Sequence, residues 1–231
     1  MYPATHAERH PDKPAIIMGE TGQVVTYREL DDASNRVARY LHGLGLRRGD
    51  GIALLLENHP RYLEVCWGAE RSGLYYTAIS TRLTPDEIAY IVEDSGAQAV
   101  ITSRTYQDVM SDVQPRLPGV RAWLMMDGAT RGFDSYEDVI DAQPAQPLAE
   151  QPRGQDLLYS SGTTGKPKGI KPRLVDEPVE TPSALLHLVQ GLYGMDEQTV
   201  YLSPAPLYHA APLRYTMAVH RLGGTAVVME R

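Results

Sequence analysis

The chain has 231 residues, of which 42% are hydrophobic and 22% charged, and its formal net charge is −7. This balance is typical of a folded globular protein and excludes a largely disordered chain. The negative charge, with no basic stripe along the sequence, argues against a nucleic-acid-binding protein.

Two further features bear on the compartment. The only cysteine, Cys66, lies in an apolar stretch, so we expect a small buried hydrophobe and no disulfide within the chain. The first ten residues lack the apolar core of a secretory signal, and no run of about 18 apolar residues could span a membrane. We therefore expect a cytoplasmic protein without a membrane span.

The first predicted element is a β-hairpin. Residues 15–18 and 24–26 are short apolar runs separated by the turn sequence Gly-Glu-Thr-Gly. The sequence Thr-Tyr-Arg-Glu at residues 26–29 is a capping box, in which the threonine and glutamate side chains satisfy each other's backbone N–H groups. Apolar residues at helical spacing follow, which predicts a helix that ends at Gly43 or Gly45.

Strands and helices alternate after this point. The predicted helices begin at Pro60 and at Thr84 and end near Gly73 and Gly96, the second with a proline at its first position. The predicted strands are residues 51–56, 74–79, 97–102 and 122–126. The alternation predicts an α/β fold of mostly parallel sheets with helices on both faces, in αβα layers.

A proline-containing stretch without periodicity divides the chain. We predict a first α/β subdomain over residues 1–142, a linker or surface crossing over residues 143–155, and the start of a second α/β subdomain over residues 156–231. No turn or cap signal follows the last apolar run, residues 225–229. We therefore expect the chain to stop within a domain.

The segment from Ser160 to Gly169 carries the chemistry. It follows an apolar strand and contains four hydroxyl side chains, three glycines and two lysines. Glycines allow backbone N–H groups to approach an anion closely, hydroxyls donate to phosphate oxygens, and lysines add charge-assisted contacts. The composition therefore predicts a cradle for a polyphosphate rather than an ordinary surface turn between two strands.

The spacing does not fit a P-loop. Gly162 and Gly165 are separated by two residues instead of four, and Pro167 follows Lys166 where a P-loop has serine or threonine. The proline also disfavours helical geometry at Lys166, so no helix opens directly behind the loop. A P-loop kinase is therefore not expected.

Residues 157–168 resemble, position for position, the phosphate-binding loop of the adenylate-forming superfamily. That superfamily includes acyl-CoA synthetases, adenylation domains of peptide synthetases and beetle luciferases. The resemblance to acyl-CoA synthetases covers nearly the whole chain: residues 26–38 look like the family's first helix, residues 48–53 like its turn into the next strand, and residues 58–60 and 68–69 like parts of its second helix.

The resemblance implies an enzyme that activates a carboxylic acid, most simply a fatty acid. The carboxylate would attack the α-phosphate of ATP, pyrophosphate would leave, and coenzyme A would take the acyl group from the acyl-adenylate. Magnesium would arrive with ATP. Lys168 is equally compatible with a solvated structural charge. The implied phosphate-binding residues are Ser160, Ser161, Gly162, Thr163, Thr164 and Gly165, with Lys166 and Lys168 nearby.

A second segment, residues 201–213, resembles the family's motif in which an aromatic residue or histidine borders the acyl pocket. A strand ends at two prolines and presents Tyr208 and His209 at the start of a helix. We expect both side chains to line the acid-binding pocket. The alternative for His209 is a histidine paired with the backbone in the core.

One similar sequence is rejected. Residues 193–197 look like the family's Tyr-Gly-x-Thr-Glu signature, whose glutamate holds magnesium, but they lie too close behind the phosphate loop and before Tyr208. We interpret Gly194 as a helix C-cap and assign no magnesium to Glu197. No metal cluster is readable from the spacing of the histidines.

The chain also departs from the family. After Gly169, many relatives continue with a Ser/Thr-His helix start. This chain instead has Ile-Lys-Pro-Arg and then the acidic, proline-containing segment 176–182. The adenine and ribose motifs, the hinge and the C-terminal lobe with its catalytic lysine lie beyond residue 231 in relatives. We therefore expect an N-terminal portion that has no catalytic residue of its own, needs the missing remainder and is inactive alone.

Two other functions remain open at this level. One is an adenylation domain for an amino or aryl acid, since most residues of the acid pocket lie downstream in relatives. The other is a non-catalytic nucleotide-binding module complete at 231 residues. The sequence also leaves a homodimer open.

Overall fold

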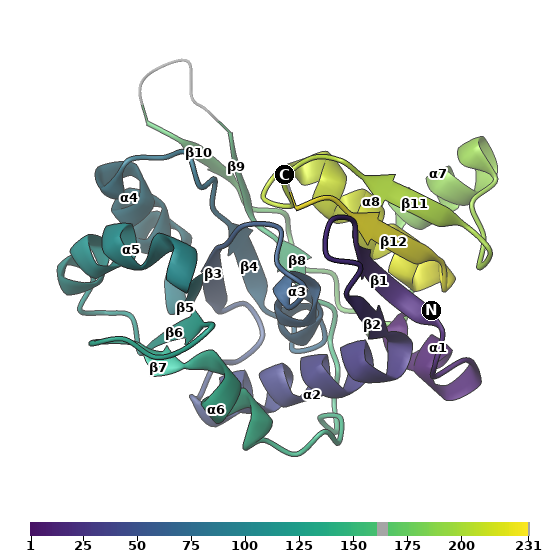
Figure 1. Cartoon of the computed structure of the whole chain (residues 1–231), viewed down its shortest axis with the longest axis horizontal. Coiled ribbons are helices and arrows are strands. Elements are labelled where there is room, and N and C mark those ends of the chain that lie inside the picture. Colours follow the sequence, from purple (N-terminus) through teal and green to yellow (C-terminus); the bar gives the residue numbers. More distant parts are fainter. Residues whose placement is uncertain (161–165, 231) are drawn as a thin grey trace.

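The computed structural model describes residues 1–160 and 166–230 (Figure 1). Its larger sheet has six strands in the order β7-β6-β5-β3-β4-β8, all parallel to their neighbours. These strands are β3 (Gly51–Leu55), β4 (Tyr75–Ala78), β5 (Ala97–Ser103), β6 (Ala122–Met126), β7 (Asp134–Ser135) and β8 (Gln155–Asp156).

Helices cover both faces of this sheet. Along β3, Ile52 and Leu54 pack with α2 (Tyr27–Gly43), α3 (Tyr62–Glu70) and α6 (Tyr136–Asp141). The alternate residues Ala53 and Leu55 pack with α4 (Pro85–Ser95) and α5 (Gln107–Val113) on the other side. Successive side chains of a strand point to opposite faces, so an unbroken apolar run indicates a strand buried on both sides. The predicted αβα arrangement is confirmed.

A second sheet joins the two ends of the chain. Its strands are β1 (Pro14–Met18), β2 (Val24–Thr26), β11 (Val200–Ser203) and β12 (Thr225–Val228), in the order β11-β12-β1-β2. β1, β12 and β11 are parallel, and β2 is the antiparallel half of the predicted hairpin. The four-stranded sheet therefore contains strands from both sides of the 143–155 stretch, and β8 of the six-stranded sheet begins inside that stretch, at Gln155. The subdomain boundaries stay a prediction.

Smaller elements complete the chain. The two-stranded hairpin of β9 (Leu158–Ser160) and β10 (Lys168–Ile170) rises from the end of the six-stranded sheet (Figure 1). The remaining helices are α1 (Pro3–Arg9), α7 (Ala184–Tyr193) and α8 (Ala210–Leu222), with short 3-10 turns at Arg104–Tyr106 and Gln114–Arg116.

Local signals set the helix ends. Both halves of the predicted capping box are present at the start of α2, and Thr84 and Glu87 form a second one at the start of α4. Gly96 ends α4 with a φ of 69°, a left-handed conformation that glycine adopts without steric cost. The helix predicted from Pro60 begins two residues later, at Tyr62.

α3 lies between the two sheets (Figure 1). All nine of its residues are buried, which is why it has no polar face. One continuous core runs from Ile52 of the larger sheet past Trp67 of α3 to Ile16 of the smaller one. Cys66 is fully buried as expected, and burial raises the pKa of its thiol. Among the described residues, no helix is both long and apolar enough to cross a bilayer.

Candidate functional site

The β9–β10 hairpin holds both ends of the predicted phosphate loop. Ser160 pairs with Lys168 and Tyr159 with Gly169 in an antiparallel register. A side chain at Gly169 would need room that the Tyr159 ring occupies, because a Cβ there would lie 2.8 Å from the ring. The predicted phosphate-binding residues Ser161, Gly162, Thr163, Thr164 and Gly165 lie outside the described residues.

Helix α4 anchors this hairpin from the side. The Tyr159 hydroxyl donates to Asp94 at 2.6 Å, and burial together with this hydrogen bond raises the pKa of Tyr159. On the other limb, the Lys166 ammonium lies 4.9 Å from the centre of the Tyr90 ring, a cation–π contact. Tyr90 and Asp94 are one helical turn apart, and the Tyr90 hydroxyl also donates to Asp94, at 3.4 Å. One face of α4 therefore contacts the residues before and after the loop.

A cavity of about 430 Å³ lies beside the hairpin. Four parts of the chain form it: the carboxyl end of β4, the start of α4, the hairpin, and the segment that leads into α8. Predicted residues from both motifs, Ser160 and the pair Tyr208 and His209, meet in this cavity. The lining residues are Ala78, Ile79, Ser80, Leu83, Glu87, Ile91, Tyr159, Ser160, Pro167, Tyr208 and His209.

Tyr208 and His209 stand at the entrance to α8. His209 is the exposed N-cap of the helix, in extended backbone geometry, whereas Tyr208 is buried. Their rings are 4.5 Å apart between centroids. The structure thus places His209 at the cavity wall and outside the core, and its role in binding the acid stays a prediction.

Asn58 fixes the segment in front of Tyr208, although the sequence did not mark it as a site residue. Its amide oxygen accepts from the backbone N–H of Leu207 at 2.8 Å, and its amide nitrogen donates to the carbonyls of Ala205 at 3.3 Å and Met229 at 2.7 Å. Asn58 follows the carboxyl end of β3, so it connects the larger sheet with the last strand of the smaller one. The signal in the sequence that could have identified Asn58 was its position directly after a predicted buried strand.

Polar groups also gather where the strand order reverses. Glu57, after β3, accepts from the hydroxyl of Ser103 at 2.6 Å and from that of Thr105 at 2.8 Å, both at the carboxyl end of β5. The chain leaves β3 toward α3 on one face and β5 toward α5 on the other. Open α/β sheets bind ligands outside the carboxyl ends of their strands at such a reversal. The cavity beside β4 adjoins this region.

The remaining predicted residues have simpler surroundings. Lys168 is the exposed first residue of β10. Gly194 caps α7 in the left-handed region with a φ of 62°, which confirms the C-cap interpretation. Glu197 lies on the turn that follows, where its carbonyl accepts from Lys13, and it is not part of the 430 Å³ cavity.

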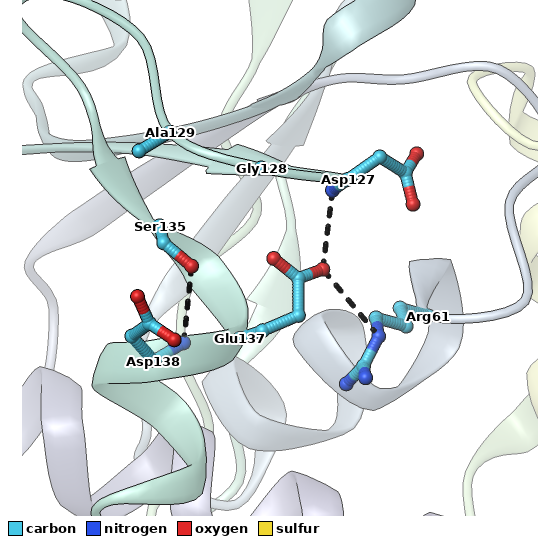
Figure 2. A pocket seen from close by; sticks show the side chains of 7 residues that line it. All are labelled: Arg61, Asp127, Gly128, Ala129, Ser135, Glu137 and Asp138. Carbon is cyan, nitrogen blue, oxygen red and sulfur yellow. Dashed lines mark hydrogen bonds and ion pairs between the residues drawn. The ribbon is translucent and has the colours of Figure 1, made fainter.

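A second hollow, of about 510 Å³, lies over the start of α6 (Figure 2). Glu137 accepts from the backbone N–H of Asp127 at 3.2 Å and is 3.8 Å from the guanidinium of Arg61, while Asp138 donates through its backbone to Ser135. These polar groups are engaged with one another, so this hollow is a weaker candidate. No group of three or more potential metal ligands occurs in residues 1–160 and 166–230.

Comparison with known proteins agrees with this architecture. The family model for the AMP-binding enzyme matches residues 4–231. A medium/long-chain-fatty-acid–CoA/3-oxocholest-4-en-26-oate–CoA ligase of Mycolicibacterium smegmatis is 27% identical over 97% of this chain and 44% of its own length. A crotonobetaine/carnitine–CoA ligase of Escherichia coli is 30% identical over 97% of this chain and 45% of its own length.

The solved structures show the same fold. The inhibitor-bound N-terminal domain of FACL13 from Mycobacterium tuberculosis superposes with a TM-score of 0.80 at 25% identity, covering 99% of this chain and 56% of that domain. The chain belongs to the AMP-binding enzyme family, the adenylate-forming ligases. It spans less than half of the length of the curated relatives it matches.

Proposed function

We propose that the protein of which these 231 residues form the N-terminal part activates a fatty acid with ATP and transfers it to coenzyme A. The acid carboxylate attacks the α-phosphate of ATP to give an acyl-adenylate and pyrophosphate. The thiol of coenzyme A then displaces AMP to give the thioester. The curated relatives named above are acid–CoA ligases, which supports this reaction class.

One observation carries the proposal: the hairpin that flanks the Ser/Thr/Gly/Lys loop and the Tyr208–His209 pair border the same cavity. The two motifs are about 40 residues apart in sequence, and each alone could be an ordinary turn. A triphosphate and a carboxylate must meet within bonding distance to react, so their binding residues have to converge. Ser160 and the Tyr208–His209 pair line one cavity, which supports the proposal.

The residues present fit both substrates. Ser160 contributes a hydroxyl at the cavity, and Lys166 and Lys168 flank the loop, so a polyphosphate would meet donors and positive charge there. Three aliphatic side chains, Ile79, Leu83 and Ile91, also line the cavity. An aliphatic surface suits a hydrocarbon chain better than an amino acid's ammonium group, because the carboxylate on the lining, Glu87, already accepts from Thr84 in the capping box of α4.

The residues of this chain would act by binding and positioning. The loop would neutralise the β- and γ-phosphates that leave as pyrophosphate, and we assign this role to the residues from Ser160 to Gly165 with Lys166. Magnesium would enter with the nucleotide, and Lys168 would add charge from the hairpin. Without the remaining residues of the ligase domain, the 231-residue chain would turn over negligibly. Its proposed location is the cytoplasm.

The test is acid-dependent pyrophosphate release by the protein made from the complete reading frame, with hexanoate, decanoate, palmitate, benzoate and phenylalanine. We expect the fatty acids to be preferred, and the T163A/T164V double variant to lose about 100-fold or more in kcat/KM. Preference for benzoate or phenylalanine would assign an aryl- or amino-acid enzyme. ATP binding without release for any acid would indicate a non-catalytic module, and full activity of T163A/T164V would refute the loop assignment.

A further inference from the structure

Helix α4 lies beside the β9–β10 hairpin (Figure 1) and also lines the cavity of about 430 Å³. Its residues Ile88, Ile91 and Val92 are buried, and Ile91 is part of the cavity lining. Tyr90 and Asp94, one turn apart, lie on another side of the helix and contact the hairpin. Neither Tyr90 nor Asp94 lines the cavity, so any effect of theirs on a ligand there passes through the hairpin.

Two tyrosine rings form this contact, Tyr90 of α4 and Tyr159 of β9. Both are half-buried and pack against the core that contains Ile79 and Ile91. The Tyr159 hydroxyl donates to one carboxylate oxygen of Asp94 at 2.6 Å, and the Tyr90 hydroxyl donates to the other at 3.4 Å. A single carboxylate therefore fixes both rings, and the core below fixes the plane on which the hairpin rests.

The second limb of the hairpin meets the same helix through Lys166. Its ammonium lies 4.9 Å from the centre of the Tyr90 ring. The next residue, Pro167, is buried and lines the cavity, and a proline disfavours helical backbone geometry at the residue before it. The proline thus restricts the backbone of Lys166, and the ring restricts its side chain.

The Tyr90 ring and a phosphate can bind the same ammonium group. A lysine has three N–H donors, and a cation–π contact occupies one side of the group. A side chain already held in one orientation loses less conformational freedom when its ligand binds, which raises the affinity. The hydrogen bond of Tyr159 acts in the same sense on the first limb, because it fixes the strand that leads to Ser160.

We propose that Tyr90 and Asp94 are positioning residues for ATP. Tyr90 orients Lys166, and Asp94 holds Tyr159, so that the residues on the two sides of the loop are set for the triphosphate before it binds. The inference rests on the proposed function only in taking ATP as the ligand of the loop. It assigns to α4 a part in nucleotide affinity that does not depend on which acid is activated.

The test measures the Kd for magnesium-ATP by titration calorimetry, without acid, in the product of the complete reading frame. Tyr90→Leu removes the ring and should raise the Kd about 3- to 5-fold, whereas Tyr90→Phe keeps the ring and should stay close to wild type. Tyr159→Phe removes the donor to Asp94 and should raise the Kd about 5-fold. Tyr40→Leu, at a half-buried tyrosine on α2, is the matched control and should leave the Kd unchanged.

The variant Lys166→Met separates positioning from general support of the fold. In that background Tyr90→Leu should change the Kd no further, because the group that the ring orients is already gone. An equal further rise would show that Tyr90 supports the fold as a whole and would overturn the proposal. Tighter binding of ATP by Tyr90→Leu would show that the ring keeps Lys166 away from the nucleotide, and would overturn it as well.

Acid-dependent pyrophosphate release by the same proteins keeps this inference separate from the proposed function. The expected pattern of Kd values without release for any acid would refute the reaction and leave the positioning role in place. Normal release by the wild type, with the same Kd in Tyr90→Leu, Tyr159→Phe and Tyr40→Leu, would refute the positioning role and leave the reaction in place.

Discussion

The two sheets of the molecule differ in how completely they are covered. The six-stranded sheet has α2, α3 and α6 on one face and α4 and α5 on the other. Within residues 1–160 and 166–230, the four-stranded sheet has helices on one face, while its other face exposes Val24, Val200 and Leu202. The comparison shows that apolar parallel strands pair regularly both where helices pack on two faces of the sheet and where they pack on one.

Polar contacts between α3 and α8, as well as apolar packing, join the two sheets. Glu70 and Trp67 of α3 face His220 and Arg221 of α8, and we call these four residues the α3–α8 interface. The guanidinium of Arg221 forms an ion pair with Glu70 and stacks 5.1 Å from the centre of the Trp67 ring. Tyr76 of β4 donates to Glu70 at 2.8 Å, which links the interface to the larger sheet.

The largest expected effect is the loss of that buried ion pair. In Arg221→Met, Glu70 would stay buried with only the Tyr76 hydroxyl as partner, so we expect the free energy of unfolding to fall by about 3–5 kcal/mol. The control is Arg116→Met, since Arg116 pairs with Asp86 and Asp112 at the surface, where solvent screens the charges and its loss should change the free energy of unfolding much less.

Urea unfolding followed by tryptophan fluorescence measures both variants. Trp67 reports on the α3–α8 interface and Trp123 of β6 on the larger sheet, so single-tryptophan versions separate the two regions. If both regions lose stability together, they unfold as one unit. Equal costs for Arg221→Met and Arg116→Met would contradict the role of the buried pair.

A smaller loss in the free energy of unfolding is expected when the pH is lowered. His220 is fully buried; its Nδ1 accepts from the Trp67 indole at 3.2 Å, so its Nε2–H donates to the Ala15 carbonyl at 3.1 Å. Burial lowers the pKa of His220 from 6.5 to about 4. Between these values the unfolded chain binds a proton that the folded chain does not, so stability falls as pH drops from 6.5 to about 4, by on the order of 3 kcal/mol.

The difference between wild type and His220→Gln isolates this contribution. His6, whose pKa burial also lowers, adds a change of the same sign in both proteins. Hydrogen exchange at pH 7 and pH 5 should show faster opening of β1 than of β3 in the wild type at the lower pH, because His220 binds the backbone of β1. A wild-type stability that changes with pH no more than that of His220→Gln would refute the assignment.

The elements of the two sheets that could be predicted from the sequence are those set by residues close together in the chain. The hairpin of residues 15–26, the capping box at Thr26, the helix start at Thr84 and four strands of the larger sheet are set by short-range periodicity and hydrogen bonding, and they were found. The two-residue strands β7 and β8 are too short to show a periodicity, and they were not predicted. Phosphate-loop and pocket motifs could be recognised because their residues are contiguous.

Long-range pairing was not predictable in the same way. Ile16 pairs with Ala226, which is more than 200 residues away in the sequence. The composition of an apolar strand does not indicate with which other strand it pairs. The ion pair of Glu70 and Arg221 and the hydrogen bonds of Asn58 also join distant parts of the chain, with separations between 147 and 171 residues. Each of these contacts depends on how the helices pack on the sheets. Hydrophobic periodicity predicts which side of a helix faces the core, but it does not predict how the helix is oriented there.

The smallest effect on stability, and the most specific on function, is expected at Asn58. Asn58→Asp keeps an acceptor for the Leu207 N–H but sets a carboxylate against the carbonyls of Ala205 and Met229, so the segment before Tyr208 should shift. We expect the KM for the acid to rise about 10-fold in the full-length enzyme while the KM for ATP changes little, because the β9–β10 hairpin is anchored separately on α4.

The matched control is Asn35→Asp, a buried asparagine on α2 that accepts from Arg71 and lies outside the cavity. It should alter the urea midpoint without a selective change in either KM. An equal rise of both KM values in Asn58→Asp would show that Asn58 supports the fold in general. A selective rise for the acid would show that the end of β3 positions the acid pocket through one carboxamide, at the point where the two sheets meet.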